Sequence, residues 1–162
     1  MSEVVNPEAE LTRLYHADYA RLVRTLGVAF DPHDAADAVQ EAYLAAFKRW
    51  RVVAAYDDPI GWIRRVAVNR LLNEQRNRRR RRDVLLVSVV TPPTDRVDDA
   101  LDLRARLAAL PAQMRVTVTL FYLEDLSGEE IAEVLGVSAS TVRSNLADAR
   151  ARLRLELSEE IV

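Results

Sequence analysis

The chain has 162 residues, of which 49% are hydrophobic and 30% are charged, a composition typical of a folded globular protein. With no cysteine it can form no disulfide and no Cys-ligated iron–sulfur cluster, and with only two histidines we expect no transition-metal site. The net charge of −2 hides one strongly basic segment, because residues 62–82 carry nine arginines and a single acidic side chain. Such a segment is typical of proteins that bind a polyanion.

The sequence predicts an all-α fold with two small helical domains, at residues 8–82 and 98–158, joined by a flexible linker at residues 83–97. In the first domain, apolar residues recur at helical spacing between Leu11 and Leu26. No apolar run is long enough to span a membrane and the N-terminus does not resemble a signal peptide, so we expect no membrane insertion and a cytoplasmic protein.

A second helix is predicted from Asp34 to Trp50. Its outer face carries a compact polar group, and taken alone this group indicates only a solvated helix face. The polar group consists of Asp37, Gln40 and Glu41. The inner face is one apolar stripe formed by Val39, Ala42, Tyr43, Ala46, Phe47 and Trp50.

A third helix is predicted to begin at Pro59, because proline fits the first turn of a helix, and to run into the arginines at 78–82. Trp62 is expected to be a buried core residue. The polar side chains of this helix are too many to face a core, and arginines suit phosphate contacts whereas asparagines can reach base edges. A solvated basic face is the alternative. These side chains are Arg64, Arg65, Asn69, Arg70, Asn73 and Arg76.

The second domain carries the strongest local motif of the chain. Ser127 and Glu130 form a capping box that begins a short helix, and Gly136 supplies a turn before a helix capped by Ser138. This arrangement predicts a helix-turn-helix, and we favour DNA recognition over a plain helical hairpin. The hydrogen-bonding side chains at the start of its second helix are Ser138, Ser140, Thr141, Arg143, Ser144 and Asn145.

The order of these segments resembles that of extracytoplasmic-function (ECF) sigma factors, which belong to the sigma-70 family of bacterial RNA polymerase. Residues 36–43 resemble region 2.2 of the family, and residues 62–69 resemble regions 2.3 to 2.4. Residues 110–115 and the helix-turn-helix resemble regions 4.1 and 4.2. The resemblance covers nearly the whole chain apart from its first residues and the linker.

The resemblance implies promoter-specific transcription initiation, with core RNA polymerase and promoter DNA as partners and with an anti-sigma factor as a further partner that it allows. Asp37, Gln40 and Glu41 would contact the clamp of the β′ subunit, and the second domain would lie at the β flap. The −10 element would be bound and melted by Tyr56, Asp57, Arg65, Asn69, Arg70, Asn73 and Arg76. The −35 element would be read by Ser138, Ser140, Thr141, Arg143, Ser144, Asn145 and Arg150.

The chain departs from the family at Asn145 and Asp148, where cations are common, so the recognition helix carries little positive charge. One alternative is a stand-alone helix-turn-helix regulator, which explains only the second domain. Another is a nonspecific nucleic-acid-binding protein driven by its arginines, which leaves the helix-turn-helix unexplained. An enzyme is the least favoured class, because we find no nucleophile–base pair, metal set or phosphate loop, and we expect no catalytic residue and no cofactor.

Overall fold

The computed structural model describes residues 6–85 and 99–160, with side chains described at 6–81 and 103–154. Within these ranges the chain forms helices and no strand, as predicted for an all-α fold. None of the described helices is both long and apolar enough to cross a membrane. The helices are α1 (Pro7–Ala29), α2 (Pro32–Lys48), α3 (Trp50–Val53), α4 (Pro59–Leu85), α5 (Asp99–Ala108), α6 (Ala112–Leu123), α7 (Gly128–Leu135) and α8 (Ala139–Glu160).

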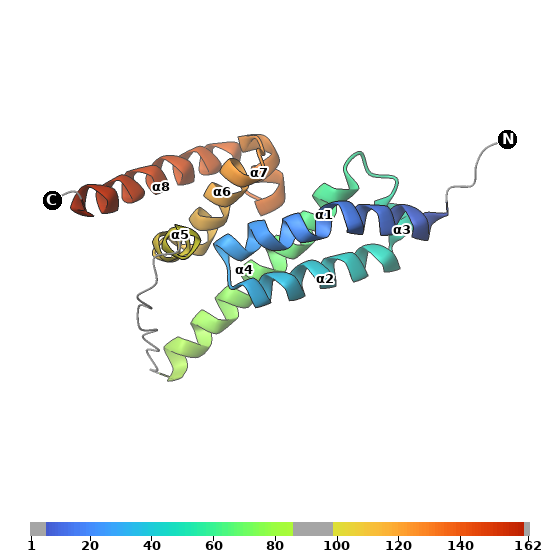
Figure 1. Cartoon of the computed structure of the whole chain (residues 1–162), viewed down its shortest axis with the longest axis horizontal. Helices are drawn as coiled ribbons and strands as arrows, with labels where there is room; N and C mark the ends of the chain where they lie inside the picture. The colour runs from blue at the N-terminus through green and yellow to red at the C-terminus, as the bar shows by residue number, and fades with distance from the viewer. Residues whose placement is uncertain (1–5, 86–98, 161–162) are drawn as a thin grey trace.

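Helices α1 to α4 form an N-terminal unit in which α2 packs between α1 and α4 (Figure 1). Proline occupies the first turn of both α1 and α2, and the Asp31 side chain caps α2 by accepting hydrogen bonds from the backbone N–H groups of His33 and Asp34. Helix α4 begins at Pro59, as predicted, but continues through Leu85 into the predicted linker. Residues 86–97 of that linker lie outside the described residues. The core of this unit includes Leu22, Leu26, Val39, Ala42, Ile63, Val68 and Leu71.

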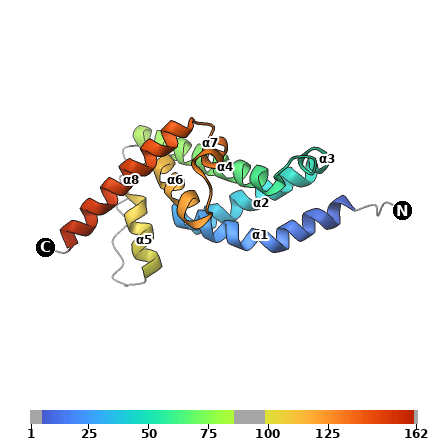
Figure 2. The ribbon, with the colours of Figure 1, turned by 90° about the horizontal axis from the view of Figure 1, so that it is seen from above.

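Helices α5 to α8 form a C-terminal unit. The predicted capping box is present: the Ser127 hydroxyl accepts from the Glu130 N–H at 3.1 Å, and the Glu130 carboxylate accepts from the Ser127 N–H. Gly136 ends α7 with a φ of 66°, a left-handed conformation that favours glycine. These local signals bring α7 and α8 together around buried Val142. Helix α8 then extends away from the other helices toward the C-terminus (Figures 1 and 2).

The two units are packed against each other. Helix α1 contacts α5 and α6, and α4 contacts α7. Phe30, which follows α1, is buried, and the Arg115 guanidinium of α6 lies 5.6 Å from the centre of its ring. Burial lowers the pKa of Arg115, and its guanidinium donates to the backbone carbonyls of Ala108 and Leu110. The apolar cores of the two units therefore meet.

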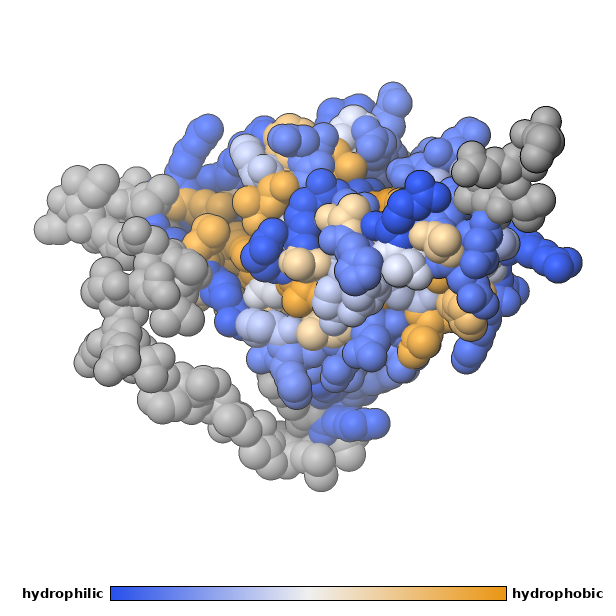
Figure 3. All heavy atoms as spheres, turned by 45° about the vertical axis from the view of Figure 1, so that its right-hand side comes forward, coloured by the Kyte–Doolittle hydropathy of each residue, from blue (hydrophilic) through white to orange (hydrophobic). Residues whose placement is uncertain are grey.

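Two aromatic side chains differ from the sequence prediction. The sequence places Phe47 in the buried stripe of α2, but 54% of it is exposed. The predicted helix ends before Trp50, which begins α3. Along α2 the buried stripe follows Ala42 and Ala46, and a helix turns about 100° per residue, so Phe47 faces away from the core. Trp62 is half-buried and packs against the edge of the core. Figure 3 shows hydrophobic patches on a face of the molecule that is mostly hydrophilic.

Candidate nucleic-acid interface

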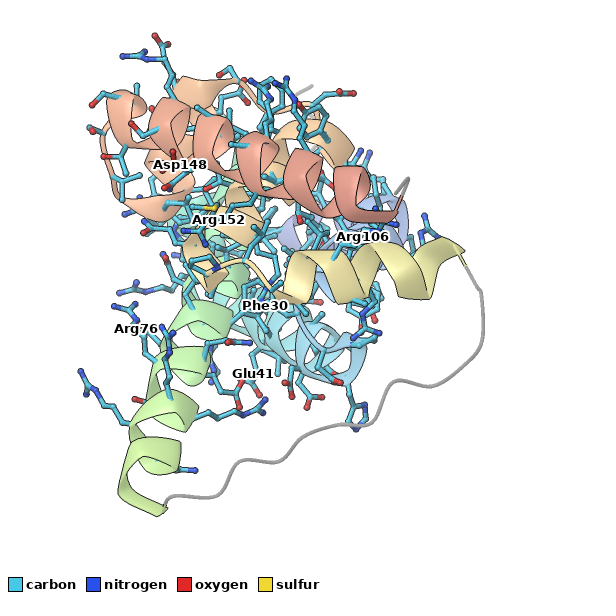
Figure 4. The ribbon with its side chains drawn as sticks, turned by 90° about the vertical axis from the view of Figure 1, so that its left-hand side faces the viewer. Phe30, Glu41, Arg76, Arg106, Asp148 and Arg152 are labelled. Carbon is cyan, nitrogen blue, oxygen red and sulfur yellow. The ribbon has the colours of Figure 1, made fainter. Side chains whose placement is uncertain are left out.

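One face of α4 carries three of the polar residues predicted to bind DNA. Arg65, Asn69 and Arg76 are separated by four and seven residues, so they follow one another along the same side of the helix. Arg65 and Arg76 are exposed and Asn69 is half-buried. Arg76 points away from α4 into solvent (Figure 4), and its guanidinium donates to the Asn73 side-chain oxygen at 2.6 Å. This face offers guanidinium groups for phosphates and amides for base edges.

Arg70 points toward α2 instead. Its Nη2 atom lies 3.7 Å from Oε2 of Glu41, and both side chains are about half exposed. An exposed pair of this kind contributes at most about 1 kcal/mol. It nevertheless places a residue predicted to bind DNA directly beside one predicted to contact polymerase.

The arginine run at the end of α4 is not uniform. Arg78 forms a bidentate pair with Asp34 of α2, at 2.7 and 3.1 Å, and these hydrogen bonds raise the pKa of the guanidinium. Arg79, Arg80 and Arg81 are exposed. Arg78 therefore ties the end of α4 to α2, while the next three arginines face solvent.

The predicted polymerase-contacting residues lie together on α2. Asp37, Gln40 and Glu41 are all exposed, on the side of the helix away from buried Val39 and Ala42. Glu41 lies on the near side of α2 in Figure 4. The helix therefore presents two carboxylates and an amide to solvent on one surface.

The loop before α4 faces the C-terminal unit across a cavity of about 480 Å³. Tyr56, Asp57 and Arg65 line one side of it, and Glu130 and Glu133 of α7 line the other. A second cavity, of about 800 Å³, lies farther along α4. Its wall includes Asn69, Arg76 and Arg79 on one side and Pro111, Leu135 and Val137 on the other.

The predicted −35 residues, at the start of α8 and along it, divide into four groups, of which Arg150 alone is the last. The Ser138 hydroxyl accepts from the Thr141 N–H at 3.2 Å and lies 2.9 Å from the hydroxyls of Ser140 and Thr141, so these three side chains form the helix cap. Arg143 and Ser144 are exposed. Asn145 is half-buried, and its buried Nδ2 atom has no hydrogen-bond partner among the described residues.

Arg150 makes contacts within its own unit. Its Nε–H donates to the Tyr122 hydroxyl at 2.8 Å, and its guanidinium lies 5.6 Å and 5.7 Å from the ring centres of Phe121 and Tyr122. These contacts of the Arg150 side chain hold α8 against α6. Arg143 is therefore the exposed cation at the start of the recognition helix, with Arg152 farther along the same helix (Figure 4).

A buried polar cluster between the units is not predicted by the sequence. Glu124 follows α6, and its side chain is only 1% exposed. Its Oε1 accepts from the Thr25 hydroxyl at 2.7 Å, and its Oε2 lies 3.6 Å from Arg21 Nη2 and 3.7 Å from Arg64 Nη2. Arg64 is buried although it belongs to the basic helix. No local signal indicates this burial, because it depends on how the two units meet.

Each of the two units matches the model of a known protein family. Residues 11–81 match the family model "Sigma-70 region 2", and residues 100–153 match "Sigma-70, region 4". The chain belongs to the sigma-70 family. In this sigma-70 chain, α1 to α4 thus correspond to region 2 and α5 to α8 to region 4, and its relatives make it a sigma factor of the ECF type.

Curated relatives include the ECF sigma factor SigE of Mycolicibacterium smegmatis, which is 36% identical over 159 residues. That alignment covers 90% of this chain and 59% of SigE, so the chain spans less than two thirds of that relative. The sigma-E factor of Streptomyces antibioticus is 36% identical over 140 residues, covering 81% of this chain and 74% of that protein. SigL of Mycobacterium tuberculosis is 32% identical over 162 residues, covering 94% and 92%.

Solved structures with the same fold span both units. The sigma factor RpoE of Bartonella quintana, solved in complex with the anti-sigma factor NepR, gives a TM-score of 0.76 at 21% identity and covers 92% of this chain and 97% of its own. CnrH, solved with the cytosolic domain of CnrY, gives 0.66 at 23% identity and covers 94% and 90%. At these identities the similarity establishes the fold.

In the part of the chain that the structure describes, no group of three or more His, Asp or Glu side chains is placed to hold a metal ion. What the described helices expose at the predicted positions is cations and amides on α4 and α8 and a carboxylate face on α2.

Proposed function

We propose that this sigma-70 chain directs core RNA polymerase to promoters in the cytoplasm, and that it acts by binding and not by catalysis. The observation that carries the proposal is the presence, on one chain, of a region 2 unit and a region 4 unit, each with its own exposed polar surface. A stand-alone regulator would need only the region 4 unit. The acidic face of α2 and the basic face of α4 would then serve no purpose.

In this proposal the exposed face of α2 binds the clamp of the β′ subunit through Asp37, Gln40 and Glu41, and region 4 lies at the β flap. Carboxylates at an interface guide the encounter with a basic partner and exclude wrong partners. Asp37 is exposed on this face, so its carboxylate is accessible to such a partner.

The −10 element would bind along α4 and the loop before it. Tyr56 offers an exposed ring on which an unstacked base can lie, next to Asp57, and Arg65 and Arg76 offer charge to phosphates. Asn69 and Asn73 would hold bases exposed by melting. Arg70 would bind the same DNA once its ion pair with Glu41 is broken.

The −35 element would be read mainly by Arg143 and Ser144, the exposed side chains at the start of α8. Ser138, Ser140 and Thr141 would present the helix N-terminus to phosphates, and Asn145 would offer its unpaired amide to the same DNA. Arg150 would support the helix through its contact with Tyr122. Because RpoE, which shares this fold, was solved with the anti-sigma factor NepR, we also propose an anti-sigma partner for this chain.

Reconstitution with core polymerase tests the proposal. Asp37→Arg should abolish polymerase association and run-off transcription while circular dichroism stays helical, because repulsion replaces attraction at the interface. Glu8→Arg makes the same change of charge at an exposed position of α1 and should transcribe like the unaltered chain. Equal polymerase association of Asp37→Arg and Glu8→Arg would contradict the docking surface. Tight promoter binding without polymerase, and no transcription with it, would favour the stand-alone regulator.

A further inference from the structure

The cavity of about 800 Å³ beside the end of α4 has a strongly basic lining, and its size suits a bound small molecule. Four arginines and three side-chain amides line it, and no aspartate or glutamate is among the described residues of its wall. Arg78 is already paired with Asp34. Arg76, Arg79 and Arg115 form no ion pair with any described residue. The cavity therefore has three cations whose charge no described carboxylate neutralises.

Arg115 is the most buried of these cations. Only 8% of it is exposed, its Nη1 atom donates to the Ala108 and Leu110 carbonyls, and its Nε–H has no hydrogen-bond partner among the described residues. A buried guanidinium is costly unless it has a counter-charge, and burial lowers the pKa of Arg115 with no described carboxylate to offset that effect. An anion in the cavity would supply the missing negative charge.

The backbone at the start of α6 adds further donors to the same cavity. Helix α6 has 12 residues, its N-cap is Pro111, and no side chain caps it. Ala112 and Gln113, which begin the helix, line the cavity. The N–H groups of a first helical turn have no partner within the helix, and they form the positive end of its dipole. Helix N-termini of this kind bind phosphate groups, and here arginines of α4 lie opposite.

We propose that this cavity binds one small polyphosphate anion per chain, with its phosphates between Arg79 and the start of α6 and with Arg115 as the buried counter-charge. A nucleoside triphosphate is the form that uses the whole cavity, because its base can lie against the apolar wall at Leu135 and Val137. The inference goes beyond the proposed function and does not rest on it, since the free chain can bind such an anion whether or not it directs polymerase.

Calorimetric titration of the full chain, in a buffer without phosphate or magnesium, tests the proposal. The ligands are ATP, inorganic tripolyphosphate and adenosine. We expect ATP and tripolyphosphate to bind at one per chain, with ATP the tighter because its base adds apolar contact, and adenosine not to bind. Equal affinities for ATP and tripolyphosphate would exclude the nucleoside and make inorganic polyphosphate the ligand. No binding of either polyphosphate at millimolar concentration, or binding of adenosine as tight as that of ATP, would overturn the proposal.

Two neighbouring arginines supply a test variant and its matched control. Arg79 and Arg80 are both exposed on α4, but only Arg79 lines the cavity. Arg79→Gln should weaken tripolyphosphate binding by about fivefold or more, because it removes a charge-assisted hydrogen bond. Arg80→Gln should leave the affinity within about twofold. An equal loss in both variants would show that the arginine run attracts anions as a whole, and would overturn the site.

A second pair of variants adds negative charge without weakening the fold. Gln113→Glu places a carboxylate in the first turn of α6, where negative charge stabilises a helix, so the melting temperature should stay or rise while tripolyphosphate binding is lost. Asn77→Asp adds the same charge at an exposed position of α4 outside the cavity, and should keep the affinity within about twofold. Undiminished binding in Gln113→Glu would contradict the proposed position of the phosphates.

Nuclear magnetic resonance locates the anion in the unaltered chain, so this measurement does not depend on how a variant folds. In isotope-labelled protein, tripolyphosphate should shift the backbone amide resonances of Ala112 and Gln113. It should leave unchanged those at the start of α7, which Ser127 already caps. Shifts confined to Arg80 and Arg81 would place the anion on the exposed arginine run and would overturn the proposal.

Discussion

The ionisation of one side chain in region 2, that of Tyr43, should make the stability of the fold depend on pH. Its ring is 5% exposed in the packing between α1 and α2, and its hydroxyl donates to the Leu14 carbonyl at 3.3 Å. The Tyr15 ring meets it edge to face, with 5.1 Å between ring centres. Burial raises the pKa of Tyr43 from its ordinary 10.0 to about 12, with the charge of Asp18 as the next contribution. The folded chain therefore retains this proton at a pH at which the unfolded chain loses it.

We predict a loss of stability in alkali that Tyr43→Phe reduces. The contribution of Tyr43 is complete below pH 10 and is lost as the pH rises through about 12, because only the unfolded chain ionises readily in that range. Its size is up to about 2 kcal/mol. Urea unfolding at a series of pH values should show a shallower decline for Tyr43→Phe. Burial also raises the pKa of Tyr19, so part of the decline should remain. Parallel curves for the two proteins between pH 10 and 12 would contradict the assignment.

At the scale of the element, α8 carries one arginine that is proposed to read DNA and another that contacts α6. Arg143 is exposed near its start, whereas Arg150 is bonded to the Tyr122 hydroxyl and stacked on two rings of α6. The sequence places both arginines in the same DNA-binding set, and their different surroundings give them different expected effects.

We predict that Arg143→Ala relaxes discrimination at one or two −35 positions by about 1–3 kcal/mol without changing the melting temperature. Arg150→Ala should instead lower the melting temperature and weaken transcription to a similar extent on every −35 variant, because it loosens α8 from α6. The measurements are transcription from promoters with single −35 substitutions and thermal unfolding of each variant. A uniform loss across −35 variants in Arg143→Ala would make that residue a phosphate contact only.

The elements that the sequence predicts well are those with local causes. The Ser127–Glu130 capping box, the left-handed Gly136 and the start of α4 at Pro59 each depend on residues within a few positions of one another. The sequence pattern wrongly predicts that Phe47 is buried, because the residues near it on α2 are also apolar. Only the direction in which each side chain leaves the helix axis distinguishes the buried residues from the exposed Phe47. In α4, position along the helix alone does not show that Arg64 is buried while Arg65 is exposed.

The sequence predicts which faces of the helices carry the candidate site, but it does not predict the contacts between helices. Helical spacing accounts for the exposed face of α2 and for the row of Arg65, Asn69 and Arg76 on α4. The pairing of Arg70 with Glu41, of Arg78 with Asp34 and of Arg150 with Tyr122 joins residues 28 to 44 positions apart. Contacts over such distances depend on how helices pack, for which a single sequence gives no signal. Their roles in binding stay predictions.

At the scale of the whole molecule, the two units share one apolar core although they correspond to separate family regions. Phe30, labelled in Figure 4, belongs to that contact, because it is 4% exposed and the Arg115 guanidinium of region 4 lies 5.6 Å from the centre of its ring. Small domains gain much from such shared burial, since each alone buries a limited apolar area. The units should therefore unfold together.

We predict a single heat-absorption peak for the unaltered chain in scanning calorimetry and two resolved peaks for Phe30→Ala. Truncation of a buried phenylalanine costs about 3–5 kcal/mol, and here much of that loss falls on the contact between the units. Phe47→Ala is the matched control, because it removes the same side chain from a position that is 54% exposed in the same unit. It should keep one peak near the original temperature. Two peaks in the unaltered chain, or the same trace for both variants, would show that the units unfold independently of the Phe30 contact.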